Sequence, residues 1–162
     1  MNKSNMLKVV LAAALLGFAT CMFLRFFRRE DDIAETTFFY DLSEKKLFAA
    51  PRDAVPPIRG LNDAEEDAVR AVVIARNGNP DDKAGRKIAY LEKYAPELKQ
   101  ILEKVRAGKA EPLPRDARNS YRFVKRLGDA EWHAVSSPEG QKIMTEWAVA
   151  VPDGKVPVVC VP

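Results

Sequence analysis

The chain has 162 residues, of which 47% are hydrophobic and 30% charged, and its formal net charge is +3. This composition is typical of a globular chain and excludes disorder throughout, and the length allows one ordinary domain plus an N-terminal segment. Five of the 26 basic residues flank the hydrophobic start, whereas all 23 acidic residues lie from Glu30 onward. The rest of the chain carries 21 basic and 23 acidic groups, so the net charge does not support nucleic-acid binding.

The hydrophobic start predicts a membrane anchor. Sixteen residues from Val9 to Leu24 carry no charge, and the apolar character continues to Phe27. As a helix, residues 9–27 would extend for about 28 Å, close to the bilayer core of about 30 Å. We therefore predict an uncleaved, single-pass transmembrane segment within residues 1–29, followed by one domain over residues 30–162. A signal peptide that is cleaved after Cys21 is the alternative.

The orientation of this anchor depends on the basic residues at its two ends. Lys3 and Lys8 precede the stretch, and Arg25, Arg28 and Arg29 follow it, so the preference of basic residues for the cytoplasmic side nearly cancels. Long domains cross membranes largely regardless of charge. We expect the body to be periplasmic or otherwise extracytoplasmic, and a cytoplasm-facing membrane tether is the alternative.

The first half of the body predicts a hairpin, a central strand and a helix. Residues 36–42 and 47–50 are rich in β-prone residues around a short polar loop, and we expect their aromatic side chains to pack in the core. Residues 51–60 hold three prolines and predict a loop, and residues 69–75 predict a central strand. Asn79 and Pro80 predict a helix start, with Ala84, Ile88, Leu91 and Ala95 on one face.

The second half predicts two further helices and three strands. A helix begins at Pro96 and ends at Gly108, and residues 111–116 form a linker. Residues 121–127 and 132–135 predict strands joined at Gly128 and Asp129, a helix follows over residues 137–147, and residues 156–159 predict an edge strand. The predicted fold is therefore α+β, a small antiparallel or mixed sheet with two to three helices on one face, preceded by an N-terminal transmembrane helix.

His133 is the only histidine in the chain. A Ser-His-Asp or Cys-His arrangement, or a zinc site of the usual type, would have to use it. On a strand its side chain points opposite those of Trp132 and Ala134, toward solvent or the rim of the sheet. We predict no catalytic residue, no metal site and no cofactor. The alternative is a small envelope enzyme that acts through His133, with Asp129 or Glu131 beside it.

Charge is unevenly distributed along the body. Residues 30–67 hold 11 acidic and four basic residues, whereas residues 99–126 hold nine basic and three acidic residues. Such segregation is common on two solvated faces that attract each other, but a basic segment with aromatic residues interleaved is also typical of a binding surface. The predicted binding residues are Arg115, Arg118, Tyr121, Arg122 and Phe123.

Four stretches carry a resemblance to a known group of proteins: FFYDLSEKKLFAAPRDAVPPI, AYLEKYAPELK, EWHAVSSPEGQKIM and VPDGKVPVVCVP. They resemble bacterial envelope proteins with one N-terminal hydrophobic segment, a family to which no activity is attached. Its members often have a cysteine just before the Pro-Asp-Gly, where this chain has Val151, so Cys160 lacks an obvious partner. We predict a membrane-anchored, non-catalytic envelope module, a protein-interaction or assembly subunit whose partner is an envelope protein.

Overall fold

The computed structural model describes residues 15–23, 35–62, 65–109, 119–149 and 154–162. The chain divides into two compact units, Met1–Ala34 and Glu35–Pro162. In the first unit, residues 15–23 are helical, and no helix within the described residues is long and apolar enough to cross a membrane. The other residues of the predicted anchor, 9–14 and 24–27, and the predicted linker at 111–116 lie outside the described residues.

The second unit has an α+β fold, as predicted. Its strands are β1 (Thr36–Asp41), β2 (Lys46–Pro51), β3 (Ala68–Ala75), β4 (Arg86–Tyr94), β5 (Arg122–Lys125), β6 (His133–Ala134) and β7 (Val158–Val159). Its helices are α2 (Pro96–Arg106) and α4 (Pro138–Thr145), with short 3₁₀ helices η2 (Lys83–Gly85) and η3 (Glu146–Ala148). The seven described strands form one antiparallel sheet in the order β2-β1-β3-β4-β5-β6, with β7 paired to β3.

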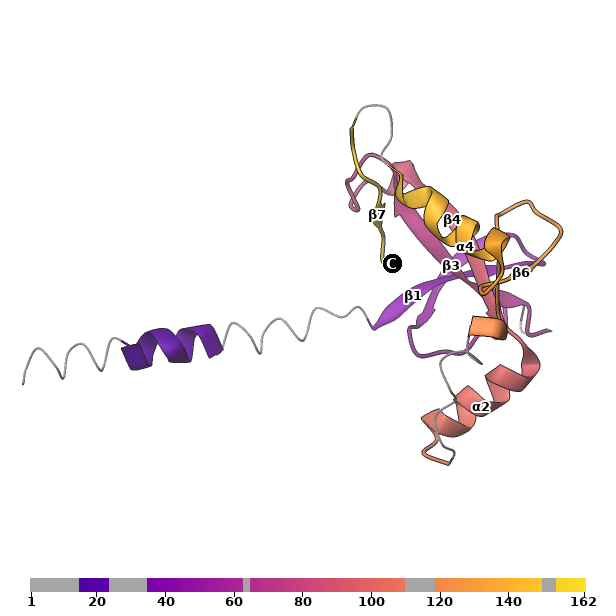
Figure 1. The fold of residues 1–162 in the computed structure, drawn as a ribbon, viewed down its shortest axis with the longest axis horizontal. Helices are drawn as coiled ribbons and strands as arrows, with labels where there is room; N and C mark the ends of the chain where they lie inside the picture. Colours follow the sequence, from indigo (N-terminus) through magenta and orange to yellow (C-terminus); the bar gives the residue numbers. More distant parts are fainter. Residues whose placement is uncertain (1–14, 24–34, 63–64, 110–118, 150–153) are drawn as a thin grey trace, which may run out of the picture. The chain divides into compact units, whose positions relative to one another are not determined.

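β3 lies at the centre of this sheet, which confirms the prediction of a central strand (Figure 1). β4 pairs along one edge of β3. The opposite edge is shared, because β1 pairs with the first half of β3 and β7 pairs with Ile74 and Ala75 in its second half. The backbone N–H of Cys160 also donates a hydrogen bond to the carbonyl oxygen of Val73 (2.8 Å). The predicted hairpin and the predicted C-terminal edge strand are thus both present.

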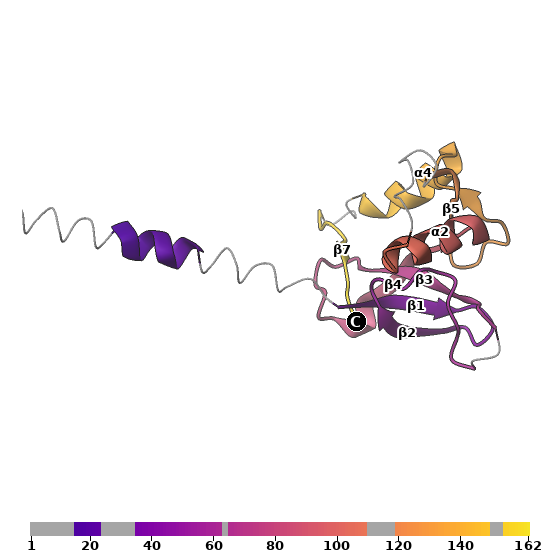
Figure 2. The ribbon, with the colours of Figure 1, turned by 90° about the horizontal axis from the view of Figure 1, so that it is seen from below.

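Side chains alternate along these strands between two faces of the sheet. We call one the α4 face, because α4 covers it; its buried residues are Tyr90, Val124, Val135 and Ile143, with Val72, Met144 and Trp147 packed against them. The other is the Leu91 face, whose buried residues are Phe38, Val69, Ala71, Val73, Ala75, Leu91 and Cys160, with Trp132 packed against them. β1 and β2 lie at the end of the sheet away from α4 (Figure 2).

The prediction of a helix that begins at Asn79 is wrong, because residues 86–94 form strand β4. The spacing of Ile88 and Leu91 fits a helix face, but β4 is paired on both edges and covered on both faces. Tyr90, Leu91 and Glu92 are consecutive and all buried, so the alternation of polar and apolar residues that indicates a strand is missing. Ala89 is an extra residue in the pairing, since Val72 pairs with Tyr90 while Val73 pairs with Ile88.

The helix-start signals of this region cap the 3₁₀ helix η2 instead. The Asp82 side chain accepts hydrogen bonds from the backbone N–H groups of Ala84 (3.1 Å) and Gly85 (3.2 Å). The Asn77 side chain donates to Asp82 (2.7 Å), which holds the connection between β3 and β4. The Asp82 cap thus begins only a short 3₁₀ helix, and pairing with β3 makes the following residues strand β4.

The other two predicted helices are confirmed. Pro96 is the first residue of α2, whose Leu98 is buried, and Gly108 follows the helix with a positive φ of 68°. Ser137 caps α4 by accepting a hydrogen bond from Gly140 N–H (3.1 Å). α4 contacts β5 and β6, whereas Lys99 of α2 donates to the carbonyl oxygen of Pro57 in the loop of residues 51–60.

A buried carboxylate joins the end of β1 to a distant loop. Asp41 has no exposed surface, and one of its oxygens accepts from the Ser43 hydroxyl and from Glu44 N–H, both at 2.8 Å. The other oxygen accepts from Leu61 N–H (2.7 Å). The backbone hydrogen bonds from Glu44 and Leu61 hold the pKa of Asp41 below its usual value, because they stabilise the charged form.

Candidate functional site

His133 lies on β6, where it pairs with Val124 of β5, and its side chain is half-buried. The two acids named as its possible partners do not join it. The Asp129 carboxylate pairs with the Arg126 guanidinium (3.3 Å), and exposed Glu131 makes no ion pair within the described residues. The structure therefore brings no carboxylate to His133 from the described part of the chain, and a catalytic role for His133 remains a prediction.

The predicted binding residues lie in different environments. Arg115 and Arg118 lie outside the described residues. Tyr121 is 44% exposed, and its carbonyl oxygen accepts from Ala95 N–H (2.9 Å), which joins the start of β5 to the residue before α2. Phe123 is half-buried in β5, where it pairs with Lys93 on one side and Ala134 on the other. Arg122 is half-buried, and its side chain is 28% exposed.

Arg122 forms an ion pair with a buried glutamate of β4. Its Nε donates to one oxygen of Glu92 (3.3 Å) and its Nη2 to the other (2.9 Å), a two-point contact, and Glu92 is only 3% exposed. Burial alone would lower the pKa of Arg122, but the hydrogen bonds and charge of Glu92 raise it overall. Burial and the same carboxylate raise the pKa values of Tyr90 and Tyr94. Arg122 and Glu92, together with the two tyrosines, thus have a structural role on the α4 face.

Arg126, one residue beyond the end of β5, also forms ion pairs. Its guanidinium contacts the carboxylates of Glu146 (2.6 Å), Glu139 (3.0 Å) and Asp129 (3.3 Å). Hydrogen bonds to these acids raise the pKa of Arg126, and the hydrogen bond and charge of Arg126 lower the pKa of Glu146. Because Glu139 lies in α4 and Glu146 in η3, Arg126 fastens both helices to the end of β5.

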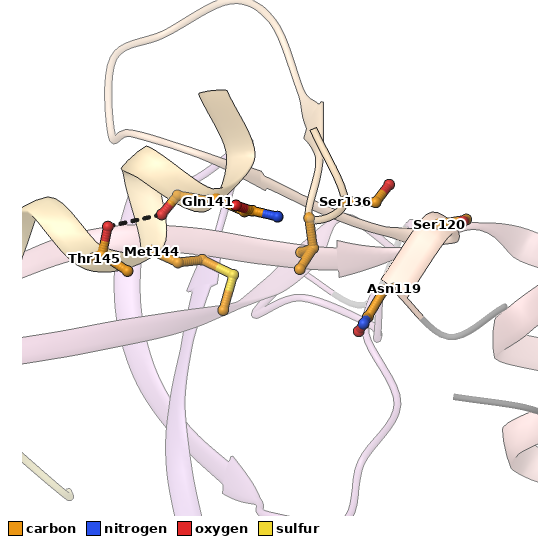
Figure 3. Close-up of a pocket in the computed structure, with 7 residues that line it drawn as sticks. Asn119, Ser120, Ser136, Gln141, Met144 and Thr145 are labelled. Atoms are coloured by element: carbon orange, nitrogen blue, oxygen red, sulfur yellow. Dashed lines mark hydrogen bonds between the residues drawn. The ribbon is translucent and has the colours of Figure 1, made fainter. Parts of the chain in front are cut away.

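A cavity of about 510 Å³ lies between α4, the turn after β6 and residues 119–120 (Figure 3). Its lining residues are Asn119, Ser120, Val135, Ser136, Gln141, Met144 and Thr145. Two of these, Asn119 and Ser120, come directly before the predicted binding residue Tyr121 in the sequence, but they are not themselves among the predicted binding residues. The lining side chains carry hydroxyl and amide groups beside a thioether and an aliphatic residue, and none of them is charged. The Thr145 hydroxyl donates to the Gln141 carbonyl oxygen (2.9 Å).

The sequence analysis did not predict this cavity, although the residue spacing in the sequence indicates one of its walls. Gln141, Met144 and Thr145 follow a spacing of three and four residues, which places them on one side of the predicted helix. Neighbouring Gly140 and Ile143 are buried against the sheet. The cavity therefore lies along the side of α4 next to the side that packs on the sheet. Its other wall comes from residues 119–120 and 136, which only the fold brings close to α4.

Within the described residues, no group of three or more His, Cys, Asp or Glu side chains is arranged to hold a metal ion. Comparison of the chain with protein-family models, with curated proteins and with solved structures finds no match. The function is therefore inferred from the geometry and chemistry of the chain itself.

Proposed function

We propose that the chain is a membrane-anchored, non-catalytic module of the bacterial envelope, which binds an uncharged segment of a partner protein in the cavity beside α4. Residues 9–27 form its transmembrane helix in this proposal, and the body lies outside the cytoplasm. The uncharged stretch from Val9 to Leu24 and the division of the chain near residue 34 support an anchor joined to a separate body.

The observation that carries the binding role is the chemistry of the cavity. Its volume of about 510 Å³ lies within the range of roughly 300–1,000 Å³ that is common for ligand sites. The amide groups of Asn119 and Gln141 can donate to and accept from a peptide backbone, and Val135 and Met144 offer apolar contact. Because the lining carries no charge, an uncharged segment meets no unpaired ion there.

Site-specific photo-crosslinking in intact envelopes tests this binding role. A photoreactive amino acid in place of Gln141, which is exposed and lines the cavity, should give a discrete adduct with the partner. The same residue in place of Lys83, which is exposed and does not line the cavity, should not give that adduct. Thr145→Trp should abolish the Gln141 adduct, because the indole occupies the cavity mouth.

The matched control is Lys142→Trp, since Lys142 is exposed on the same helix but does not line the cavity. It should leave the adduct unchanged. A Gln141 adduct that survives Thr145→Trp, or an identical adduct from position 83, would contradict binding in the cavity.

A further inference from the structure

Two lysines and a tryptophan meet on the Leu91 face, on the opposite side of the sheet from the cavity. Lys93 of β4 pairs with Phe123, and Lys125 of β5 pairs with Leu91. Because paired residues share a face, the two lysines project from neighbouring strands to the same side. Trp132 comes just before β6, the next strand of the sheet, and packs against the Leu91 face.

Both ammonium groups contact the same indole ring. Lys93 Nζ lies 4.6 Å from the ring centroid of Trp132, and Lys125 Nζ lies 5.0 Å from it. These are cation–π distances, so the ring partly stabilises each charge. Two like charges on one ring also repel each other, and burial together with the charge of Lys125 lowers the pKa of Lys93.

No carboxylate of the described residues compensates this pair of charges. Lys125 Nζ donates to the backbone carbonyl oxygen of Asp129 (3.1 Å), while the Asp129 carboxylate is bound by Arg126. Glu92 is the sequence neighbour of Lys93, but it faces the other side of the sheet, where it is paired with Arg122. Each ammonium has three N–H donors, and among the described residues only the bond from Lys125 to Asp129 uses one, which leaves the others for a ligand.

We propose that Lys93, Trp132 and Lys125 form a binding site for a phosphate group. A phosphate monoester carries about two negative charges at neutral pH and three acceptor oxygens, which match two ammonium ions. Lysine binds phosphate as a point charge, without the fixed two-point geometry of an arginine fork. The phosphate belongs either to a soluble monoester, which matches both ammonium charges, or to the headgroup of an anionic lipid, whose phosphodiester carries one negative charge.

The emission of Trp132 provides the measurement. The chain has two tryptophans, so Trp147→Phe in the full-length chain leaves Trp132 as the only tryptophan. The protein in neutral detergent is titrated with inorganic phosphate, and it is mixed separately with vesicles of phosphatidylcholine alone or with phosphatidylglycerol. A saturable change with inorganic phosphate assigns a soluble phosphate. A change only with phosphatidylglycerol vesicles assigns a lipid headgroup.

Lysine variants in the same background show whether the response comes from this site. Lys93→Gln with Lys125→Gln should weaken binding by about tenfold or more, since both charges are lost. Lys83→Gln with Lys87→Gln removes the same charge from exposed residues and should leave binding unchanged. Lys93→Arg with Lys125→Arg keeps both charges and should retain binding, which separates loss of charge from loss of folding.

The proposal is overturned if neither inorganic phosphate nor phosphatidylglycerol changes the emission, or if the double glutamine variant responds like the unchanged chain. Either result would leave the proposal of partner binding in the cavity untouched, because the crosslinking experiment at Gln141 tests a different surface and a different partner.

Discussion

Arg122 illustrates how a residue chosen for one role can have another. The sequence predicted it to lie on a binding surface, whereas the structure pairs it with buried Glu92 at 2.9 and 3.3 Å. Glu92 lies 30 positions earlier, on a strand that the sequence predicted to be a helix. That pairing could not be predicted, because it depends on β4 and β5 being neighbours. Binding by Arg122 remains a prediction, but reversing its charge would also leave Glu92 buried without its partner.

We therefore expect Arg122→Ala to reduce the free energy of unfolding by about 3 kcal/mol, because an isolated buried carboxylate is costly. Glu92→Gln combined with Arg122→Met removes both charges and should restore most of this loss. Urea unfolding of the two variants, followed by circular dichroism, checks this. If the double variant is as unstable as Arg122→Ala, the ion pair is not the cause.

Asp41 makes the stability of the fold depend on pH. Backbone hydrogen bonds from Glu44 and Leu61 lower the pKa of Asp41 in the folded state. The ionised carboxylate therefore contributes fully to the free energy of unfolding above the pKa of the unfolded chain, about 3.9. This contribution is lost as the pH falls through the lower pKa of the folded state. Asp41→Asn should be less stable than the unchanged chain at neutral pH, since an amide offers one acceptor oxygen where two carboxylate oxygens accept now.

The difference between Asp41→Asn and the unchanged chain should narrow as the pH falls below about 4, where the aspartate of the unfolded chain becomes protonated, and onward through the lower pKa of the folded state. Urea midpoints measured across this pH range check the sign. Asp53→Asn is a matched control, because Asp53 is exposed and pairs only with Arg106 among the described residues. A difference that stays constant with pH would contradict the role of the Asp41 charge.

At the scale of elements, the predictions that succeeded rest on local signals. The β1–β2 hairpin, the Pro96 start of α2 and the Ser137 cap of α4 each depend on a few neighbouring residues. β4 failed because its conformation is decided by pairing with β3 and β5 and by cover on both faces. The same error hid the Lys93–Trp132–Lys125 site, since Lys93 and Lys125 share a face only when both are on strands.

The contact between α4 and β6 has no space for a larger side chain at Gly140. A Cβ atom there would overlap the carbonyl oxygen of Ala134 and lie 2.9 Å from its carbonyl carbon. Gly140→Ala should therefore reduce the free energy of unfolding by about 1–3 kcal/mol, despite the higher helix propensity of alanine. Gln141→Ala, on the exposed side of the same helix, should change it by less than about 0.5 kcal/mol. Equal effects in urea unfolding would contradict direct backbone packing.

At the scale of the whole molecule, the orientation of the anchor decides which partners the body meets. We expect a C-terminal tag to be digested when protease is added to spheroplasts, because the body is proposed to lie outside the cytoplasm. Val161 is 52% exposed, so a tag attached beyond it need not disturb β7. A cytoplasmic marker must stay intact in the same sample. Protection of the tag would instead favour the cytoplasm-facing tether.

The shared edge of β3 has a consequence for self-association. β1 covers the first half of this edge and β7 the second, with Cys160 N–H bonded to Val73. Without β7, the backbone groups of residues 73–75 on that side would have no strand partner, next to buried apolar residues such as Ile74. An uncovered strand edge is a template for pairing with another chain. A chain shortened before residue 154 would therefore tend to aggregate through β3, even where the rest of the sheet stays folded.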